Sequence, residues 1–165
     1  MKRLSPVLAA LAVLLCAAAA SAHFGMIIPS QDVVLEKGKA EVKLTLSFSH
    51  PMEMQGMDMV KPEEFGVFEG GKKADLLADL KETKVMGKKA WAASHALKTP
   101  GVFSYYMVPA PYWEPAEDCY IQHLTKVVVP AFGEEEGWNE PIGLKAEIVP
   151  LTRPFGNYAG NVFTG

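Results

Sequence analysis

The strongest constraint on the fold is a strict alternation of apolar and polar residues that ends at His50. The apolar side chains occupy every second position, namely Ala40, Val42, Leu44, Leu46 and Phe48. This period of two is typical of a β-strand with one face in a core and the other in water. His50 continues the apolar phase, and Pro51 ends the predicted strand because proline cannot donate a hydrogen bond to the ladder.

Further strand-like segments follow, and glycine or proline turns separate them. We predict strands at residues 65–69, 74–80, 91–97, 102–108, 119–129 and 142–149. Residues 75–82 also fit two helical turns, so a short helix is the alternative there. We predict a hairpin around residues 86–88. In the turn before residue 102, Pro100 presets φ and Gly101 is expected to adopt the left-handed conformation.

Seven or eight short antiparallel strands in a chain of this size predict an all-β fold, an immunoglobulin-like β-sandwich. We place this domain at residues 23–150, with strands from about residue 24. Its predicted core residues are Leu44, Leu46, Phe48, Trp91, Phe103, Tyr105, Val127 and Ile148. Residues 151–165 are rich in glycine and aromatic side chains, and we expect them to form a C-terminal tail or a truncated linker.

The first 22 residues have the three parts of a secretory signal peptide. Lys2 and Arg3 precede an apolar run from Val7 to Ala20, and Ala20-Ser21-Ala22 supplies the small residues of a cleavage site. The run is too short for a membrane-spanning anchor. We therefore predict a signal peptide over residues 1–22 and a periplasmic protein with no stable membrane anchor.

Charge and cysteine content narrow the classes of partner. The whole chain has a net charge of −3, and loss of Lys2 and Arg3 with the signal peptide changes it to −5. A negative balance argues against nucleic acid and against an anionic membrane surface. Cys16 would leave with the signal peptide, so Cys119 remains as the single thiol and no intramolecular disulfide can form. We expect Cys119 to be buried and structural.

The sequence motifs do not indicate an enzyme. The chain has neither a G-x-S-x-G motif nor an H-E-x-x-H motif. Cys119 and His123 are four positions apart, which on a strand separates them by about 13 Å at ~3.3 Å per residue. That distance is too long for a nucleophile and its base. We therefore expect a protein without catalytic activity.

The segment that begins at His50 is rich in groups that bind metal ions. It contains two carboxylates and four methionines, which are Met52, Met54, Met57 and Met59. Thioether sulfur suits Cu(I), whereas imidazole suits Cu(II), Ni(II) and Zn(II). The alternative is a disordered loop or a loop that contacts a partner, because methionine also serves at adaptable surfaces. We expect no core residue in this polar, glycine-containing segment.

His23 lies beside the predicted cleavage site. Cleavage after Ala22, Ser21 or Ala20 would make it the first, second or third residue of the mature chain. Each of these positions places a ring nitrogen within chelating reach of the new α-amine, and the third position would offer Cu(II) or Ni(II) four nitrogens. We expect His23 to approach His50 at one edge of the sandwich.

The two remaining histidines carry weaker signals. His123 is in phase with Ile121, and a core position and a metal-binding position are equally supported for it. His95 shares a strand face with Trp91, so we expect a hydrogen-bonded, half-buried side chain there.

The sequence contains the blocks A-H-F-G-M-I-I-P-S, F-S-H-P-M-E, D-M-V-K-P-E-E-F-G-V, P-A-P-Y-W-E-P-A-E-D, H-L-T-K-V-V-V and P-L-T-R-P-F-G-N-Y-A-G-N. Together these blocks resemble an uncharacterised family of periplasmic nickel-uptake components, the NikM/NikK-like family. The resemblance covers the first domain of such proteins, and members commonly continue into a second β-domain. It implies an exported metal-binding or metal-delivery protein that accompanies an energy-coupling-factor transporter for nickel or cobalt. It singles out His23 and His50, and less strongly His123.

Three functions are compatible with the sequence. The first is a periplasmic, non-enzymatic protein that captures Ni(II) or Co(II) and passes it to a membrane importer. The second is a periplasmic copper carrier that uses His23 for Cu(II) and the methionines for Cu(I). The third is a metal-free adhesion or interaction module in which the Tyr112-Trp113 loop contacts a partner.

Overall fold

The structure is a computed structural model that describes residues 24–35, 40–115 and 117–165. The predicted signal peptide (1–22) and His23 lie outside these residues. Within the described ranges, no helix is long and apolar enough to cross a membrane. The regular structure there consists of eleven strands and two short 3₁₀ turns, so the fold is all-β as predicted.

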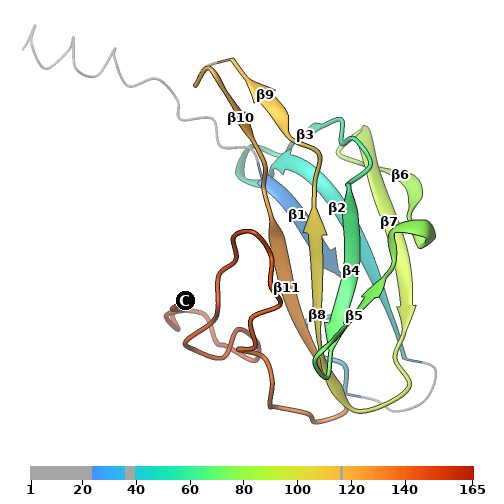
Figure 1. Ribbon diagram of the computed structural model, residues 1–165, viewed down its shortest axis with the longest axis vertical. Helices are drawn as coiled ribbons and strands as arrows, with labels where there is room; N and C mark the ends of the chain where they lie inside the picture. Colours follow the sequence, from blue (N-terminus) through green and yellow to red (C-terminus); the bar gives the residue numbers. More distant parts are fainter. Residues whose placement is uncertain (1–23, 36–39, 116) are drawn as a thin grey trace, which may run out of the picture.

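Two antiparallel sheets form the body of the molecule (Figure 1). The first contains, in spatial order, β1 (Phe24–Pro29), β2 (Glu41–His50), β7 (Lys88–Ala96) and β6 (Lys81–Val85), and β3 (Gln55–Met57) pairs with the end of β2. The second contains β11 (Thr125–Ala131), β8 (Gly101–Val108), β4 (Glu64–Glu69) and β5 (Lys72–Asp75). A separate hairpin of β9 (Tyr112–Glu114) and β10 (Cys119–Ile121) projects past one end of the two sheets. The 3₁₀ turns are η1 (Pro51–Glu53) and η2 (Leu77–Asp79).

The strand order confirms the immunoglobulin-like β-sandwich. The order β1-β2-β7-β6 corresponds to strands A, B, E and D of that fold, and β11-β8-β4 corresponds to G, F and C. After β1 the chain leaves the first sheet and forms a parallel bridge between Val34 and Ala131, at the end of β11. The N–H of Val34 donates to the carbonyl oxygen of Pro130 at 3.0 Å, and the N–H of Phe132 donates to that of Val34 at 2.7 Å. The first part of the domain therefore contacts both sheets.

The core lies between the sheets and contains buried residues of β2 together with buried residues of β8. Of the predicted core residues, four are buried, namely Leu44, Leu46, Phe103 and Tyr105. Three others, Phe48, Trp91 and Val127, are partly buried and pack against the core cluster. The prediction is wrong for Ile148, which is 65% exposed. In β2 the predicted apolar face is buried at Val42, Leu44 and Leu46, but the prediction of a solvent-exposed opposite face is wrong at Ser47 and Ser49, which are 2% and 0% exposed.

The predicted strand at residues 142–149 does not form, and this segment is irregular. The carboxylate of Glu147 accepts hydrogen bonds from the N–H groups of Ile142 and Gly143 at 3.0 and 2.8 Å. It also pairs with the ammonium group of Lys126 on β11 at 2.8 Å. These contacts curl the segment around one side chain, so its alternation leads to no sheet pairing. Strands consequently end at Ala131, well before residue 150.

Two further predicted strands are shorter than expected. The segment 119–129 is interrupted at residues 122–124, which separates β10 of the hairpin from β11 of the sandwich. The segment 74–80 leaves the sheet at Asp75, whose carboxylate accepts the N–H of Leu77 at 2.7 Å and begins η2. The result is one 3₁₀ turn, which is neither the strand nor the two-turn helix that the pattern allowed.

The turns follow the predicted chemistry with one exception. The hairpin between β6 and β7 turns at Met86 and Gly87, which have φ values of 49° and 75°. Gly101 is not in the left-handed region, so that part of the prediction is wrong. A Cβ there would lie 2.6 Å from Oε1 of Glu69, which is the end of a flexible side chain and can move away.

Candidate functional site

His123 lies in the interruption between β10 and β11, at the end of the sandwich where β1 begins and β2 ends. The antiparallel register places Phe24 opposite Ser49 and Gly25 opposite Phe48. Gly25 also packs directly on His123, because a Cβ on Gly25 would lie 3.1 Å from the Cβ of that histidine. The start of β1, the end of β2 and the bend at His123 therefore meet at one corner of the molecule.

Aromatic rings surround His123 at this corner. The ring of Tyr112 on β9 stacks parallel to the imidazole, with centroids 5.7 Å apart and planes 6° apart. The hydroxyl of Tyr112 is 3.2 Å from Nε2 of His123. The ring of Phe48 on β2 lies 4.9 Å from Tyr112 and 5.9 Å from His123. These three side chains line a small pocket of about 80 Å³, which Met59 and the segment 109–111 close from the other side.

His50 is the last residue of β2 and is buried. It pairs with Gln55 on β3 and has the same strand phase as Phe48, two residues earlier. Two residues along a strand span about 7 Å. Because the ring of Phe48 lies against His123, His50 and His123 belong to the same corner. The predicted partner His23 is outside the described residues, and the first described residue, Phe24, faces Ser49.

The four methionines of the predicted metal segment are separated by the fold. Met52 in η1 is 93% exposed, and Met54, at a left-handed position with φ 54°, is 73% exposed. Met57 is partly buried on β3 opposite Phe48. Met59 belongs to the core, and its carbonyl oxygen accepts the indole N–H of Trp91 at 3.1 Å. The expectation that this segment contributes no core residue is wrong at Met59.

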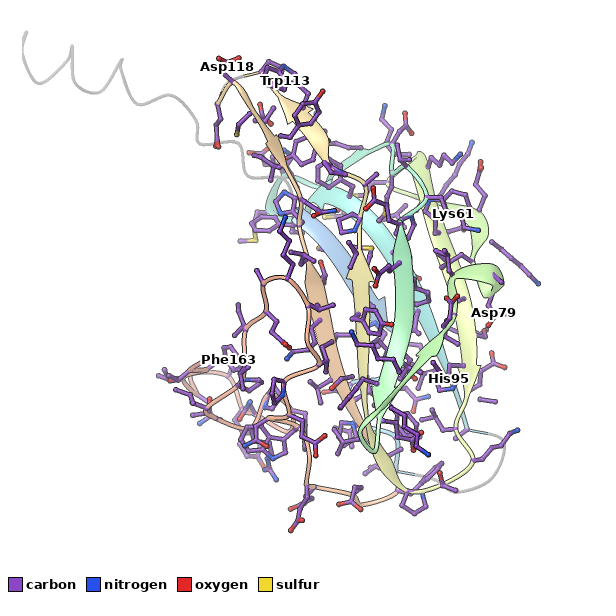
Figure 2. All side chains as sticks on the ribbon, viewed as in Figure 1. Lys61, Asp79, His95, Trp113, Asp118 and Phe163 are labelled. Carbon is purple, nitrogen blue, oxygen red and sulfur yellow. The ribbon has the colours of Figure 1, made fainter. Side chains whose placement is uncertain are left out.

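His95 has the role that the sequence indicated. Its Nδ1 is 2.9 Å from the hydroxyl of Tyr105, and its ring packs edge-on against the rings of Phe103 and Tyr105. Burial lowers the pKa of His95, and the nearby charge of Asp79 opposes this with a smaller effect. Figure 2 shows His95 on β7, well away from the hairpin end of the molecule. It takes no part in the candidate site.

Cys119 is exposed, so the prediction of a buried structural thiol is wrong. It lies on β10 opposite Glu114, in a two-stranded hairpin that has no facing sheet. A strand outside the sandwich has no core to offer its side chains, and the alternation around residue 119 therefore carries no information on burial.

Tyr112 is the site residue that the sequence analysis did not identify. It was considered together with Trp113 as a partner-binding loop, but the two side chains occupy opposite faces of β9. Trp113 is exposed and packs edge-on against Tyr120 with centroids 5.1 Å apart, near the hairpin tip (Figure 2). Burial raises the pKa of the Tyr112 hydroxyl, and the charges of Glu114, Glu117 and Cys119 add to this effect. The alternation of side chains over residues 112–114 was the sequence signal that could have separated Tyr112 from Trp113.

The described residues do not by themselves form a metal site of His, Cys, Asp or Glu ligands. Across residues 24–35, 40–115 and 117–165, no three His, Cys, Asp or Glu side chains are grouped closely enough to hold an ion. The corner supplies two imidazoles, and His23 lies outside those ranges. A third nitrogen donor would have to come from elsewhere.

Comparison with known protein families assigns the chain to a family. A family model described as "Domain of unknown function (DUF4198)" matches residues 20–165. The chain belongs to the DUF4198 family. The matched region contains all four histidines of the DUF4198 chain and the whole sandwich. No curated protein matches it.

Proposed function

We propose that the protein is a periplasmic, non-enzymatic metal-binding protein that captures Ni(II) or Co(II) and delivers it to a membrane importer. The observation that carries the proposal is the corner where the end of β2, the strand that carries His50, meets the start of β1 and the ring of His123. Two imidazoles on different segments of one rigid sandwich form a partial nitrogen site. Imidazole suits Ni(II), Co(II) and Cu(II) better than it suits hard ions such as Mg²⁺.

The mature N-terminus is the third donor in this proposal. His23 precedes Phe24 in the sequence, and cleavage after Ala22 would leave an α-amine on His23 itself. An α-amine has a reference pKa of roughly 8, so near neutral pH the metal displaces its proton at modest cost. The amine and the imidazole of one residue close a chelate ring, and His50 and His123 would complete three or four nitrogen ligands.

The same corner also suits release of the ion. His50 is on β2 and His123 is held by contacts with β1, β2 and β9, whereas the proposed third ligand is the end of the mature chain. Loss of one ligand from such a site lowers affinity without unfolding the domain. The resemblance to periplasmic nickel-uptake components supports delivery to an importer of the energy-coupling-factor type.

Isothermal titration with Ni(II) and Co(II) tests the proposal on the correctly cleaved protein. We expect His23→Ala, His50→Ala and His123→Ala each to weaken binding at least tenfold, which corresponds to about 1.4 kcal/mol. Extra residues ahead of His23 should also weaken binding, because they remove the amine from the chelate. His95→Gln is the matched control, since this histidine is half-buried, hydrogen-bonded to Tyr105 and distant from the corner, and should not affect affinity. Equal affinities for all variants would contradict the proposal.

A copper carrier is the second candidate, and the exposure of two methionines favours it. Met52 and Met54 are 93% and 73% exposed directly after His50, so their sulfur atoms can reach an ion in solution. Anaerobic titration with Cu(I) separates the two functions. The copper carrier requires tight Cu(I) binding that is lost in a Met52→Leu/Met54→Leu variant, whereas the nickel carrier requires Ni(II) binding that this variant retains.

A further inference from the structure

The imidazole of His123 is restrained by contacts from several elements. Tyr112 stacks on its face, and Phe48 lies 5.9 Å away on β2. Gly25 of β1 lies against its Cβ. The hydroxyl of Thr125 is within hydrogen-bonding distance of the carbonyl oxygens of Gly25 and His123, at 2.7 and 3.1 Å. Both the main chain and the ring of His123 are therefore positioned by the fold.

The contact of this ring with Tyr112 bears on which of its nitrogens can bind a metal. Nε2 of His123 is 3.2 Å from the hydroxyl of Tyr112. A neutral imidazole has one N–H and one lone pair. If Nε2–H donates to the tyrosine oxygen, the lone pair is on Nδ1. If the tyrosine hydroxyl donates to Nε2, then Nδ1 carries the hydrogen and neither nitrogen can bind an ion.

We propose that Tyr112 is a positioning residue that accepts a hydrogen bond from Nε2–H of His123 and thereby makes Nδ1 the nitrogen that binds the metal ion. This inference rests on the proposed function, and it adds the tautomer and the residue that sets it. Metal-binding histidines generally donate their second ring N–H to an oxygen acceptor, which fixes the tautomer and the ring orientation. A phenolic oxygen can serve as that acceptor.

The stacking geometry explains why a tyrosine suits this role. The parallel rings, 6° apart, keep the hydroxyl of Tyr112 beside the imidazole edge that carries Nε2. Tyr112 is itself held on β9 by its pairing with Ile121 and by the ring of Phe48 at 4.9 Å. A hydroxyl on such a fixed ring orients its neighbour more strictly than one on a flexible side chain.

The test compares Tyr112→Phe with Tyr120→Phe, a matched control on the exposed face of the same hairpin. Tyr112→Phe keeps the stacked ring and removes only the hydroxyl, so thermal unfolding should change little. Long-range ¹H–¹⁵N spectra of the metal-free protein at about pH 8, where imidazole is ordinarily neutral, report the tautomer of His123. We expect the Nε2–H form in the wild type and in Tyr120→Phe, and a loss of this bias in Tyr112→Phe.

Ni(II) titration of the same proteins provides the second readout. Tyr112→Phe should bind about 10- to 100-fold more weakly than the wild type, as is typical when the partner of a metal-binding histidine is removed. Adding Tyr112→Phe to His123→Ala should cause no further loss, because the tyrosine acts through that imidazole.

Each other outcome has a defined meaning. An Nδ1–H tautomer in the wild type, or wild-type affinity in Tyr112→Phe, overturns the role of Tyr112 while the proposed function stands on the loss caused by His123→Ala. A phenolate charge-transfer band with Cu(II) that disappears in Tyr112→Phe would make Tyr112 a direct ligand and also overturns the inference. Absence of metal binding by the wild type refutes the proposed function and the inference together.

Discussion

His95 and His123 are each hydrogen-bonded to a tyrosine, but through different ring nitrogens and in different surroundings. Tyr105 meets Nδ1 of His95 inside the sandwich, whereas Tyr112 meets Nε2 of His123 at its edge. Tyr105 is fully buried, and burial raises the pKa of its hydroxyl, with the charge of Glu69 as a second cause. Both members of the inner pair are therefore held neutral, which suits a structural role.

His95 should make the stability of the protein depend on pH. Burial lowers its pKa below the ordinary value of 6.5, so the unfolded chain binds a proton more readily than the folded chain. The folded state then loses stability as pH falls below 6.5, until the lowered pKa is reached. We expect urea denaturation at about pH 7.5 and pH 5.5 to show that the free energy of unfolding falls more for the wild type than for His95→Gln. A constant difference between the two proteins at both pH values would contradict this.

At the scale of elements, the segment after β11 lacks strands, and one carboxylate connects its residues 142–147 to β11. Glu147 and Lys126 form an ion pair in which the side chains are only 10% and 8% exposed. Burial alone would raise the pKa of Glu147, but the hydrogen bonds from Lys126, Ile142 and Gly143 outweigh it and lower the pKa to about 2. The carboxylate is therefore charged at any physiological pH and holds residues 142–147 on the edge of β11.

Glu147→Gln should loosen this segment. The change leaves the ammonium group of Lys126 without its carboxylate, and hydrogen bonds to charged groups are worth about 1.5–3 kcal/mol. We expect amide exchange at Ile142 and Gly143 to become about 10- to 100-fold faster. In the wild type, amide exchange at these two residues should become faster only as the pH falls from 4.5 to about 2. The reason is that a carboxyl group with a lowered pKa contributes stability above that range and loses it within it.

Glu135→Gln is the control for this experiment. Glu135 also pairs with a cation, Arg153, but at 3.6 Å and with both side chains well exposed. Exposed ion pairs contribute about 0–1 kcal/mol, so the amide exchange of residues 142 and 143 should not change. Equal effects of the two substitutions would show that the buried pair does not hold the segment.

At the scale of the whole molecule, the sandwich has a continuous core between a five-stranded sheet and a four-stranded sheet. Cys119 is a free, exposed thiol, and no three His, Cys, Asp or Glu side chains in the described part of the chain are grouped as metal ligands. The core thus does not depend on cross-links among those residues. A domain of about 140 residues buries roughly two-thirds of its unfolded surface, which suffices for independent folding.

We therefore expect the processed protein to unfold in one cooperative transition in the presence of reductant and a chelator. Adding Ni(II) to a concentration 100 times its dissociation constant should then stabilise the fold by about 2.7 kcal/mol, since the ion binds the folded state. Thermal and urea denaturation with and without the ion measure both effects. Loss of cooperative unfolding on chelation would instead make the metal a structural element.

Local patterns in the sequence were enough to determine the fold class and the strands that face the core. The alternation before His50 and the turn at residues 86–87 act over a few neighbouring residues, and the structure contains the predicted strand and the predicted turn, although Ser47 and Ser49 on the expected solvent face of the strand are buried. A period of two reports which face of a strand is apolar, and turn residues report where the chain can reverse. Neither property depends on distant parts of the chain, so both can be predicted directly from the local sequence.

The tertiary structure alone decided which segments meet. Residues 142–149 alternate like a strand, yet Glu147 turns them onto Lys126, and Cys119 is exposed because its strand lies outside the two sheets. The contact of Tyr112 with His123 likewise depends on where the hairpin leaves the sandwich. Such contacts arise from the packing of elements far apart in sequence, and local periodicity carries no information about them. The sequence therefore identified His50 and His123 as candidate ligands, but only the fold placed them at one corner with Tyr112 beside them.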